Sequence, residues 1–306
     1  MKTVREIRKV WKSRPTLEGA GVHLKRAFGY DQVPLFDPFL LLDDFHSDNP
    51  HHYLRGFPWH PHRGIETITY VREGRVEHGD SMGNSGVINA GDVQWMTAGG
   101  GIIHQEMPKG AGDGRMWGFQ LWANLPAADK MMTPRYRGLS AGEIPEARVG
   151  NVAVKVICGT VDGISGPVRD VVVEPEYLDV SIPAGAAFRH PVKRGHTAFA
   201  YVAEGEGHFD GNRSAYAHDA VGLNYFDFPK RCVCGPETLV LYGDGDEVAI
   251  SAFEGPVRFL LVSGRPIGEP VAWYGPIVMN TEEELRVAFA EYEAGTFVKK
   301  GKEAAS

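Results

Sequence analysis

Short runs rich in Val, Ile, Thr, Tyr and Phe alternate with glycine and proline along this chain of 306 residues. The 38 glycines and 20 prolines punctuate runs too short for most helices, and such runs are typical of strands joined by tight turns. The sequence therefore predicts an all-β architecture of sandwiches or barrels. The clearest predicted strands cover residues 65–71, 87–89, 93–97 and 116–122, and then 171–182, 197–203, 238–242, 248–253 and 258–263.

One helix is predicted at the end of the chain, over residues 281–295. Thr281 and Glu284 have the spacing of a capping box, and Gly295 supplies a stop. An apolar face follows the helical period, formed by Leu285, Ala288, Phe289 and Tyr292. We expect this face to pack on the sheets, because most amphipathic helices cover a core.

The two halves of the chain resemble one another weakly. Residues 65–74 and 196–205 share the pattern Tyr-Val-x-Glu-Gly, and the length is about twice that of a common domain. We predict a duplicated fold with domains at residues 1–135 and 136–306, and a linker within residues 131–145, where Pro, Gly and charge interrupt the strand pattern.

Two matched spacings place metal-competent side chains in the first half. His60 and His62 are two residues apart, as are His104 and Glu106. Residues two apart in a strand share a face, so four ligands converge if the two faces meet. A lone buried histidine is usually a hydrogen-bonded core residue, but two such pairs beside β-type sequence are harder to obtain by chance. We predict one divalent ion, with Fe, Ni, Cu, Mn and Zn left open.

The ligand set points to a catalytic or sensing site. A closed structural zinc site usually includes cysteine, and this set contains none. Glu106 could also act as the base that ionises a substrate hydroxyl. Phe57 and Trp59 flank the first pair and are predicted to line a pocket for a flat ring, whereas Trp95 is expected in the core.

The second copy lacks these ligands. With the two Tyr-Val pairs superposed, His60 falls on Pro191 and His62 on Lys193. The stretch that carries His104 and Glu106 has no counterpart there either. We expect no metal at the equivalent place.

Charge and cysteine content limit the classes of partner. A net charge of −7 and a sequence pI near 6.0 give no general attraction to nucleic acid or anionic membranes. Cys158, Cys232 and Cys234 form no CxxC pair, so a disulfide scaffold is not expected. The chain shows no apolar run of membrane-spanning length. We predict a cytoplasmic, soluble monomer.

Five stretches carry a resemblance to the pirin family of the cupin superfamily. They are DPFLLLDDF (residues 37–45), GFPWHPHRGIETITY (56–70), GDVQWMTAGGGIIHQEMP (91–108), GFQLWANLP (118–126) and GPIVMNTEEE (275–284). The resemblance implies two tandem cupin β-barrel domains of jelly-roll type. It also implies a single metal, usually iron, held by His60, His62, His104 and Glu106.

The resemblance also bears on the pocket. It places Asp43 and Phe57 at the pocket mouth, and Trp59 stands where many relatives have a small or polar residue. Glu66 matches the glutamate of the wider cupin pattern, which in pirins is not a ligand.

Pirins suggest two classes of function. Some cleave quercetin and related flavonols with molecular oxygen, which predicts a metal-dependent dioxygenase acting on a small aromatic or enolic substrate. Others are non-enzymatic regulators that bind a transcription factor or a metabolic enzyme, with iron as a redox switch. We favour the enzyme, because an open metal site beside aromatic residues accounts for more of the sequence.

Overall fold

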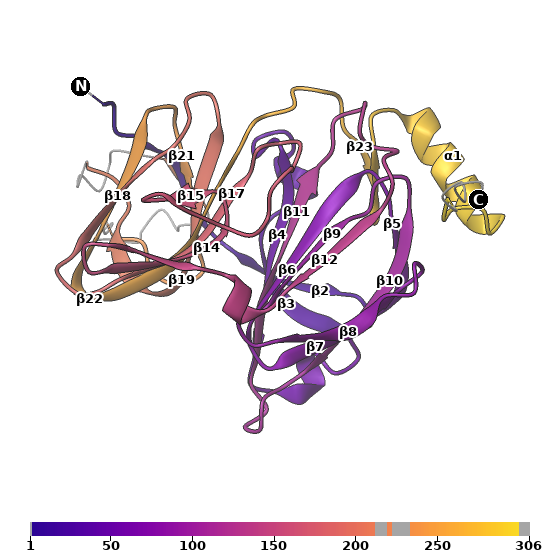
Figure 1. Ribbon diagram of the computed structural model, residues 1–306, viewed down its shortest axis with the longest axis horizontal. Helices are drawn as coiled ribbons and strands as arrows, with labels where there is room; N and C mark the ends of the chain where they lie inside the picture. Colours follow the sequence, from indigo (N-terminus) through magenta and orange to yellow (C-terminus); the bar gives the residue numbers. More distant parts are fainter. Residues whose placement is uncertain (1, 212–218, 222–232, 300–306) are drawn as a thin grey trace. The chain divides into compact units, whose positions relative to one another are not determined.

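A computed structural model describes residues 2–211, 219–221 and 233–299 (Figure 1). The chain folds into two compact units, each built from two segments. The first unit comprises residues 15–141 and the chain from residue 267 onward, and the second comprises the chain up to residue 14 and residues 142–266.

The first unit contains two sheets. Its seven-stranded sheet has the order β12 (Arg135–Leu139), β9 (Val93–Thr97), β6 (Ile65–Glu73), β11 (Met116–Asn124), β4 (Phe39–Ser47), β3 (Val22–Phe28) and β2 (Arg14–Glu18). Its four-stranded sheet has the order β5 (Phe57–His62), β10 (Ile102–Lys109), β7 (Arg75–Asp80) and β8 (Ser85–Asn89). Short 3-10 turns cover Tyr30–Gln32, Pro50–His52 and Ala141–Glu143.

The second unit is built around one long strand, β22 (Glu247–Gly264). The first part of β22 pairs with β18 (Ala187–Pro191), and its later part pairs with β17 (Glu176–Ile182) and β19 (Thr197–His208). The sheet is completed by β13 (Glu146–Val149), β14 (Val152–Cys158), β21 (Thr238–Tyr242), β1 (Ile7–Lys12) and β20 (Asp219–Val221), and β15 (Thr160–Val161) pairs separately with β16 (Ile164–Ser165).

The end of the chain returns to the first unit through residues 267–281, here called the strap. The strap carries the hairpin of β23 (Ala272–Tyr274) and β24 (Ile277–Met279) and leads into α1 (Glu282–Glu293), drawn in yellow in Figure 1. The predicted capping box is present, because Thr281 Oγ1 accepts from the Glu284 amide and the Glu284 carboxylate accepts from the Thr281 amide. The buried residues Leu285 and Ala288 pack in one cluster with strap residues, which confirms that the helix covers a core.

The predicted strands 248–253 and 258–263 form one strand rather than two. The residues between the two predicted strands, which include Gly255 and Pro256, lie where β22 changes partners, and the strand continues through them. The predicted strand 171–182 is also too long. Its first five residues are not extended, because Glu174 has a positive φ of 47° and Pro175 follows it.

The all-β fold with two cupin-type units and a C-terminal helix is confirmed, whereas no closed barrel is seen within the described ranges. In the first unit the strands form one sheet of seven and one of four. The chain passes from the smaller sheet to the larger one between β5 and β6, which are joined by Arg63 and Gly64.

The predicted linear division at residue 135 also differs from the compact units. Strand β12 pairs with β9 of the first unit, β1 joins the sheet of the second, and the strap and α1 return to the first.

Candidate metal centre

Two adjacent strands bring three histidines together. Strands β5 and β10 pair in antiparallel register, with His104 opposite His60 and Ile102 opposite His62. Along β10 the buried residues alternate, so His104 and Glu106 point to the same buried face, as the spacing predicts. Each of the three histidines, His60, His62 and His104, contributes one ring nitrogen, and these three nitrogens lie within 4.8 Å of one another.

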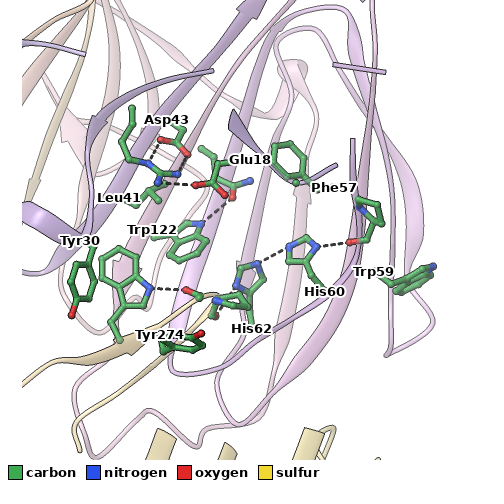
Figure 2. Close-up of a pocket in the computed structure, with 17 residues that line it drawn as sticks. Glu18, Tyr30, Leu41, Asp43, Phe57, Trp59, His60, His62, Trp122 and Tyr274 are labelled. Carbon is green, nitrogen blue, oxygen red and sulfur yellow. Dashed lines mark hydrogen bonds and ion pairs between the residues drawn. The ribbon is translucent and has the colours of Figure 1, made fainter. Parts of the chain in front are cut away.

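The hydrogen bonds of the Nδ1 atoms determine the tautomers of His60 and His62. His60 Nδ1 lies 2.8 Å from the carbonyl of Pro58, and His62 Nδ1 lies 3.1 Å from the carbonyl of Pro276. A carbonyl can only accept, so both Nδ1 atoms carry the proton and both Nε2 atoms carry a lone pair in the neutral ring. These two Nε2 atoms are 3.0 Å apart (Figure 2). His60 Nε2 is also 3.0 Å from His104 Nε2.

Two facing lone pairs cannot hydrogen-bond to one another without an added proton. A cation placed among them satisfies all three nitrogens at once, and the carbonyls of Pro58 and Pro276 then orient the rings, as hydrogen-bond partners do in known metal sites. The donors present therefore fit a divalent metal that accepts imidazole.

Burial keeps the cluster in the state that binds metal. Burial is the main cause that holds the pKa of His62 well below 6.5, and the neighbouring His60 and His104 lower it further. The pKa of His104 is also well below 6.5, again chiefly through burial, with smaller contributions from His60 and His78. At neutral pH both imidazoles are therefore uncharged and able to coordinate.

Glu106 is buried, but its carboxylate lies outside the histidine cluster. Its Oε1 accepts from Thr69 Oγ1 at 2.7 Å, and its Oε2 accepts from Gln120 Nε2 at 2.9 Å. The register between β10 and β5 shifts between His104 and Glu106, so Glu106 lies opposite Phe57 rather than opposite Pro58. The structure therefore brings together three of the four predicted ligands, and the ligand role of Glu106 stays a prediction.

A cavity of about 730 Å³ opens beside the cluster, entirely within the first unit. This volume is in the range of small-molecule sites. His60 and His62 form part of its wall, and aromatic rings form much of the rest (Figure 2). The aromatic lining residues are Tyr30, Phe57, Trp59, Trp122, Trp273 and Tyr274.

The cavity also has a polar end. Arg26 donates to both carboxylate oxygens of Asp43, at 2.8 and 2.7 Å, and forms an ion pair with Glu18 at 2.9 Å. All three side chains line the cavity. A ligand that binds beside the histidines would therefore find hydrogen-bonding groups at its other end.

The residues that the sequence places near the pocket differ in their burial and in their contacts with the cavity. Asp43 lines the cavity but is bound to Arg26, Phe57 is partly buried in the lining, and Trp59 is 53% exposed. Trp95 is buried in the core, as expected. Glu66 accepts from Thr97, on the face of β6 opposite to that of Thr69, so it points away from Glu106.

The sequence reasoning missed Gln120, Trp122 and the strap residues that line the cavity. Gln120 and Trp122 lie in the GFQLWANLP stretch, and the GPIVMN stretch begins at the cavity wall with Gly275. Both stretches carried the family resemblance. Alternation from a buried position on β11 could have placed Gln120 on the face of Trp122.

The equivalent hairpin of the second unit has other contacts. Pro191 ends β18, and the Lys193 ammonium lies 2.7 Å from a carboxylate oxygen of Glu174. His190 Nε2 is instead 2.8 Å from Glu176 Oε2. The two superposed positions thus hold a proline and an ion-paired lysine. Neither side chain offers the nitrogen lone pair with which a neutral imidazole binds a metal.

Among the remaining expectations, Cys158 and Cys234 are buried and form no disulfide within the described residues, and Cys232 lies outside those residues. None of the helices in the described part of the chain has the length and apolar character needed to cross a membrane.

Two cupin-type units, of which the first carries an imidazole cluster at the wall of an aromatic cavity, define a bicupin with a candidate metal centre. The chain belongs to the pirin family. The Pirin family profile matches residues 21–123, and that of the Pirin C-terminal cupin domain matches residues 177–298.

Individual relatives agree with this assignment. A pirin-like protein of Caulobacter vibrioides is 46% identical over 296 residues, covering 96% of this chain and 99% of the relative. A solved structure of quercetin 2,3-dioxygenase from Acinetobacter baumannii has a TM-score of 0.82 and 28% identity, covering 96% of this chain and 99% of its own. The pirin YhhW from Escherichia coli, solved in complex with nickel(II), shares the fold with a TM-score of 0.61 and 21% identity, covering 84% and 98%.

Proposed function

We propose that this protein is a metal-dependent dioxygenase that cleaves quercetin-like flavonols or another enolisable aromatic compound. The observation that carries the proposal is the convergence of three imidazole nitrogens at the wall of an aromatic cavity. The likeness to a quercetin 2,3-dioxygenase at 28% identity over nearly the whole chain supports it.

The proposed ligands are His60, His62, His104 and Glu106, with Fe(II) as the first choice of metal. Nickel is the second, since a related fold has been solved with that ion. When bound, the ion lowers the pKa of a coordinated enol and supplies the redox chemistry of the reaction with oxygen.

The protein's own residues orient the substrate and handle its proton. The ring centroids of Trp122 and His62 lie 5.1 Å apart at an interplanar angle of 85°. Both residues line the cavity, so Trp122 offers an apolar surface for a flat ligand beside the histidines. Glu106 lies behind Gln120 rather than in the cavity lining, and it accepts two hydrogen bonds. A carboxylate has about four acceptor sites, so Glu106 has lone pairs left to take the enol proton from a substrate that reaches it. Phe57 and the strap residues form the apolar wall of this end of the cavity.

Oxygen uptake tests the proposal. The metal-free protein is loaded anaerobically with Fe(II), Ni(II), Mn(II), Cu(II) or Zn(II), and oxygen consumption is then followed with quercetin and with small enediols. We expect consumption above that of the free ion with at least one redox-active metal, and loss of it in the His62→Ala variant.

The outcome that would contradict the enzyme is no oxygen uptake with any metal, together with a protein partner that binds the ferrous and ferric forms differently. In that case the redox-responsive regulator replaces the dioxygenase.

A further inference from the structure

Gln120 lines the cavity, whereas Glu106 does not. Gln120 lies on β11, half-buried, with Trp122 two residues further along the same face. It is therefore placed between the cavity and the buried carboxylate.

The orientation of the Gln120 amide is fixed from both sides. Its Oε1 accepts from Trp122 Nε1 at 2.9 Å, and an indole N–H can only donate. Its Nε2 donates to Glu106 Oε2 at 2.9 Å and to Thr69 Oγ1 at 3.2 Å. The reversed amide would place an oxygen against a carboxylate and an N–H against an indole N–H, so one orientation alone satisfies all the groups.

Thr69 completes the same arrangement. Its hydroxyl accepts from Gln120 and therefore directs its own proton to Glu106 Oε1. Both oxygens of Glu106 thus receive one donor each. Each oxygen keeps a second lone pair, which leaves the carboxylate able to serve a cation while its hydrogen bonds hold its plane.

We propose that Gln120 is a positioning residue of the metal centre, which holds and orients the carboxylate of Glu106 through its amide. The inference rests on the proposed function, because it takes Glu106 as a ligand. It goes beyond that proposal in assigning a role to a side chain on another strand, whose amide bonds to the carboxylate and to Trp122. Hydrogen-bond partners of metal ligands commonly change metal affinity by about 10- to 100-fold when removed.

The test compares Gln120→Leu with Gln105→Leu as a matched control. Gln105 is a half-buried glutamine next to Glu106 on β10, but alternation points it to the other face. Two properties are measured: the affinity for Co(II) and Zn(II), by competition with a chromophoric chelator, and the visible absorption spectrum of the Co(II) protein, which reports the ligand geometry and would not respond to a loss of stability alone.

We expect Gln120→Leu to weaken metal binding about 10- to 100-fold and to shift the Co(II) bands. Thr69→Val removes the other donor to Glu106, and it should also weaken metal binding and shift the Co(II) bands. Gln105→Leu should leave both near the wild-type values. If Gln120→Leu does not fold, Gln120→Met provides an unbranched replacement of similar length that is judged by the same criteria.

The Glu106→Ala variant separates the two possible failures. If it changes the affinity and the spectrum while Gln120→Leu and Gln120→Met leave both unchanged, the positioning role is wrong and the ligand set stands. If Glu106→Ala also changes neither, Glu106 is not a ligand and the role of Gln120 is overturned with it.

Discussion

The Arg63 guanidinium lies 2.7 Å from a carboxylate oxygen of Glu291, which connects the residue after His62 to the C-terminal helix. Arg63 also donates to the carbonyls of Gly100 and Phe297 and stacks 4.3 Å from the Phe297 ring. Together with the hydrogen bond between His62 Nδ1 and the Pro276 carbonyl, these contacts anchor one end of the histidine cluster to the end of the chain.

This anchor predicts unequal effects at its two ends. Arg63→Ala removes a buried side chain and leaves the carbonyls of Gly100 and Phe297 without their donor, and should lower the free energy of unfolding of the first unit by about 3 to 5 kcal/mol. Glu291→Gln should lower it less, by about 1 to 2 kcal/mol, because the amide oxygen of glutamine can still accept from Arg63 and Arg63 keeps its two carbonyls. Urea denaturation of both variants checks this. Equal losses would contradict the anchoring role of Arg63.

Metal content should depend on the clustered histidines and not on histidines elsewhere. We expect His62→Ala and Glu106→Ala to lose stoichiometric metal and keep their circular dichroism spectra, since the strands are held by other residues. His51→Ala, an exposed histidine outside the cluster, is the control. Elemental analysis of dialysed protein gives the result, and full metal retention in Glu106→Ala would remove Glu106 from the ligand set.

The lowered pKa values of His62 and His104 predict a pH dependence with a definite sign. In the unfolded chain both histidines take up protons as the pH falls below about 6.5, while the folded state keeps them neutral to lower pH. The unfolded state then binds more protons, so the metal-free protein loses stability as the pH falls from about 6.5 toward the folded pKa values. Metal affinity should fall in the same direction, because protons compete for the nitrogens.

Urea midpoints of the metal-free protein between about pH 5 and 8 measure this effect. The slope should be smaller in a His62→Gln, His104→Gln double variant, which has nothing to protonate at these positions. An unchanged slope would assign the pH dependence to other groups.

The second unit is predicted to bind no metal at the hairpin that corresponds to β5 and β6. We expect one tightly bound ion per chain, unchanged in Lys193→Ala, because Lys193 is paired with Glu174. Two tightly bound ions per wild-type chain, with one lost on a change near Lys193, would overturn the assignment.

Several features of the site could be read from the sequence because they depend on short-range geometry. The spacing of His60 and His62, and of His104 and Glu106, predicts a shared face from strand alternation alone, and both strands are present. The capping box at Thr281 and Glu284 is equally local. The prediction of two separate strands at residues 248–253 and 258–263 was wrong, because the pairing partners that make them one strand are not specified by the local sequence.

Residue order alone was enough to predict the strand-rich composition, the one helix, the family resemblance and the pairing of candidate ligands along each strand. The folded chain was needed to learn that the two strands meet, that Thr69 and Gln120 donate hydrogen bonds to the carboxylate of Glu106, and that Pro276 contacts His62 from 214 residues away. Alternation and caps follow from the geometry of a few neighbouring residues, whereas contacts between distant segments are fixed by the packing of the whole unit and by the route that the chain takes through it.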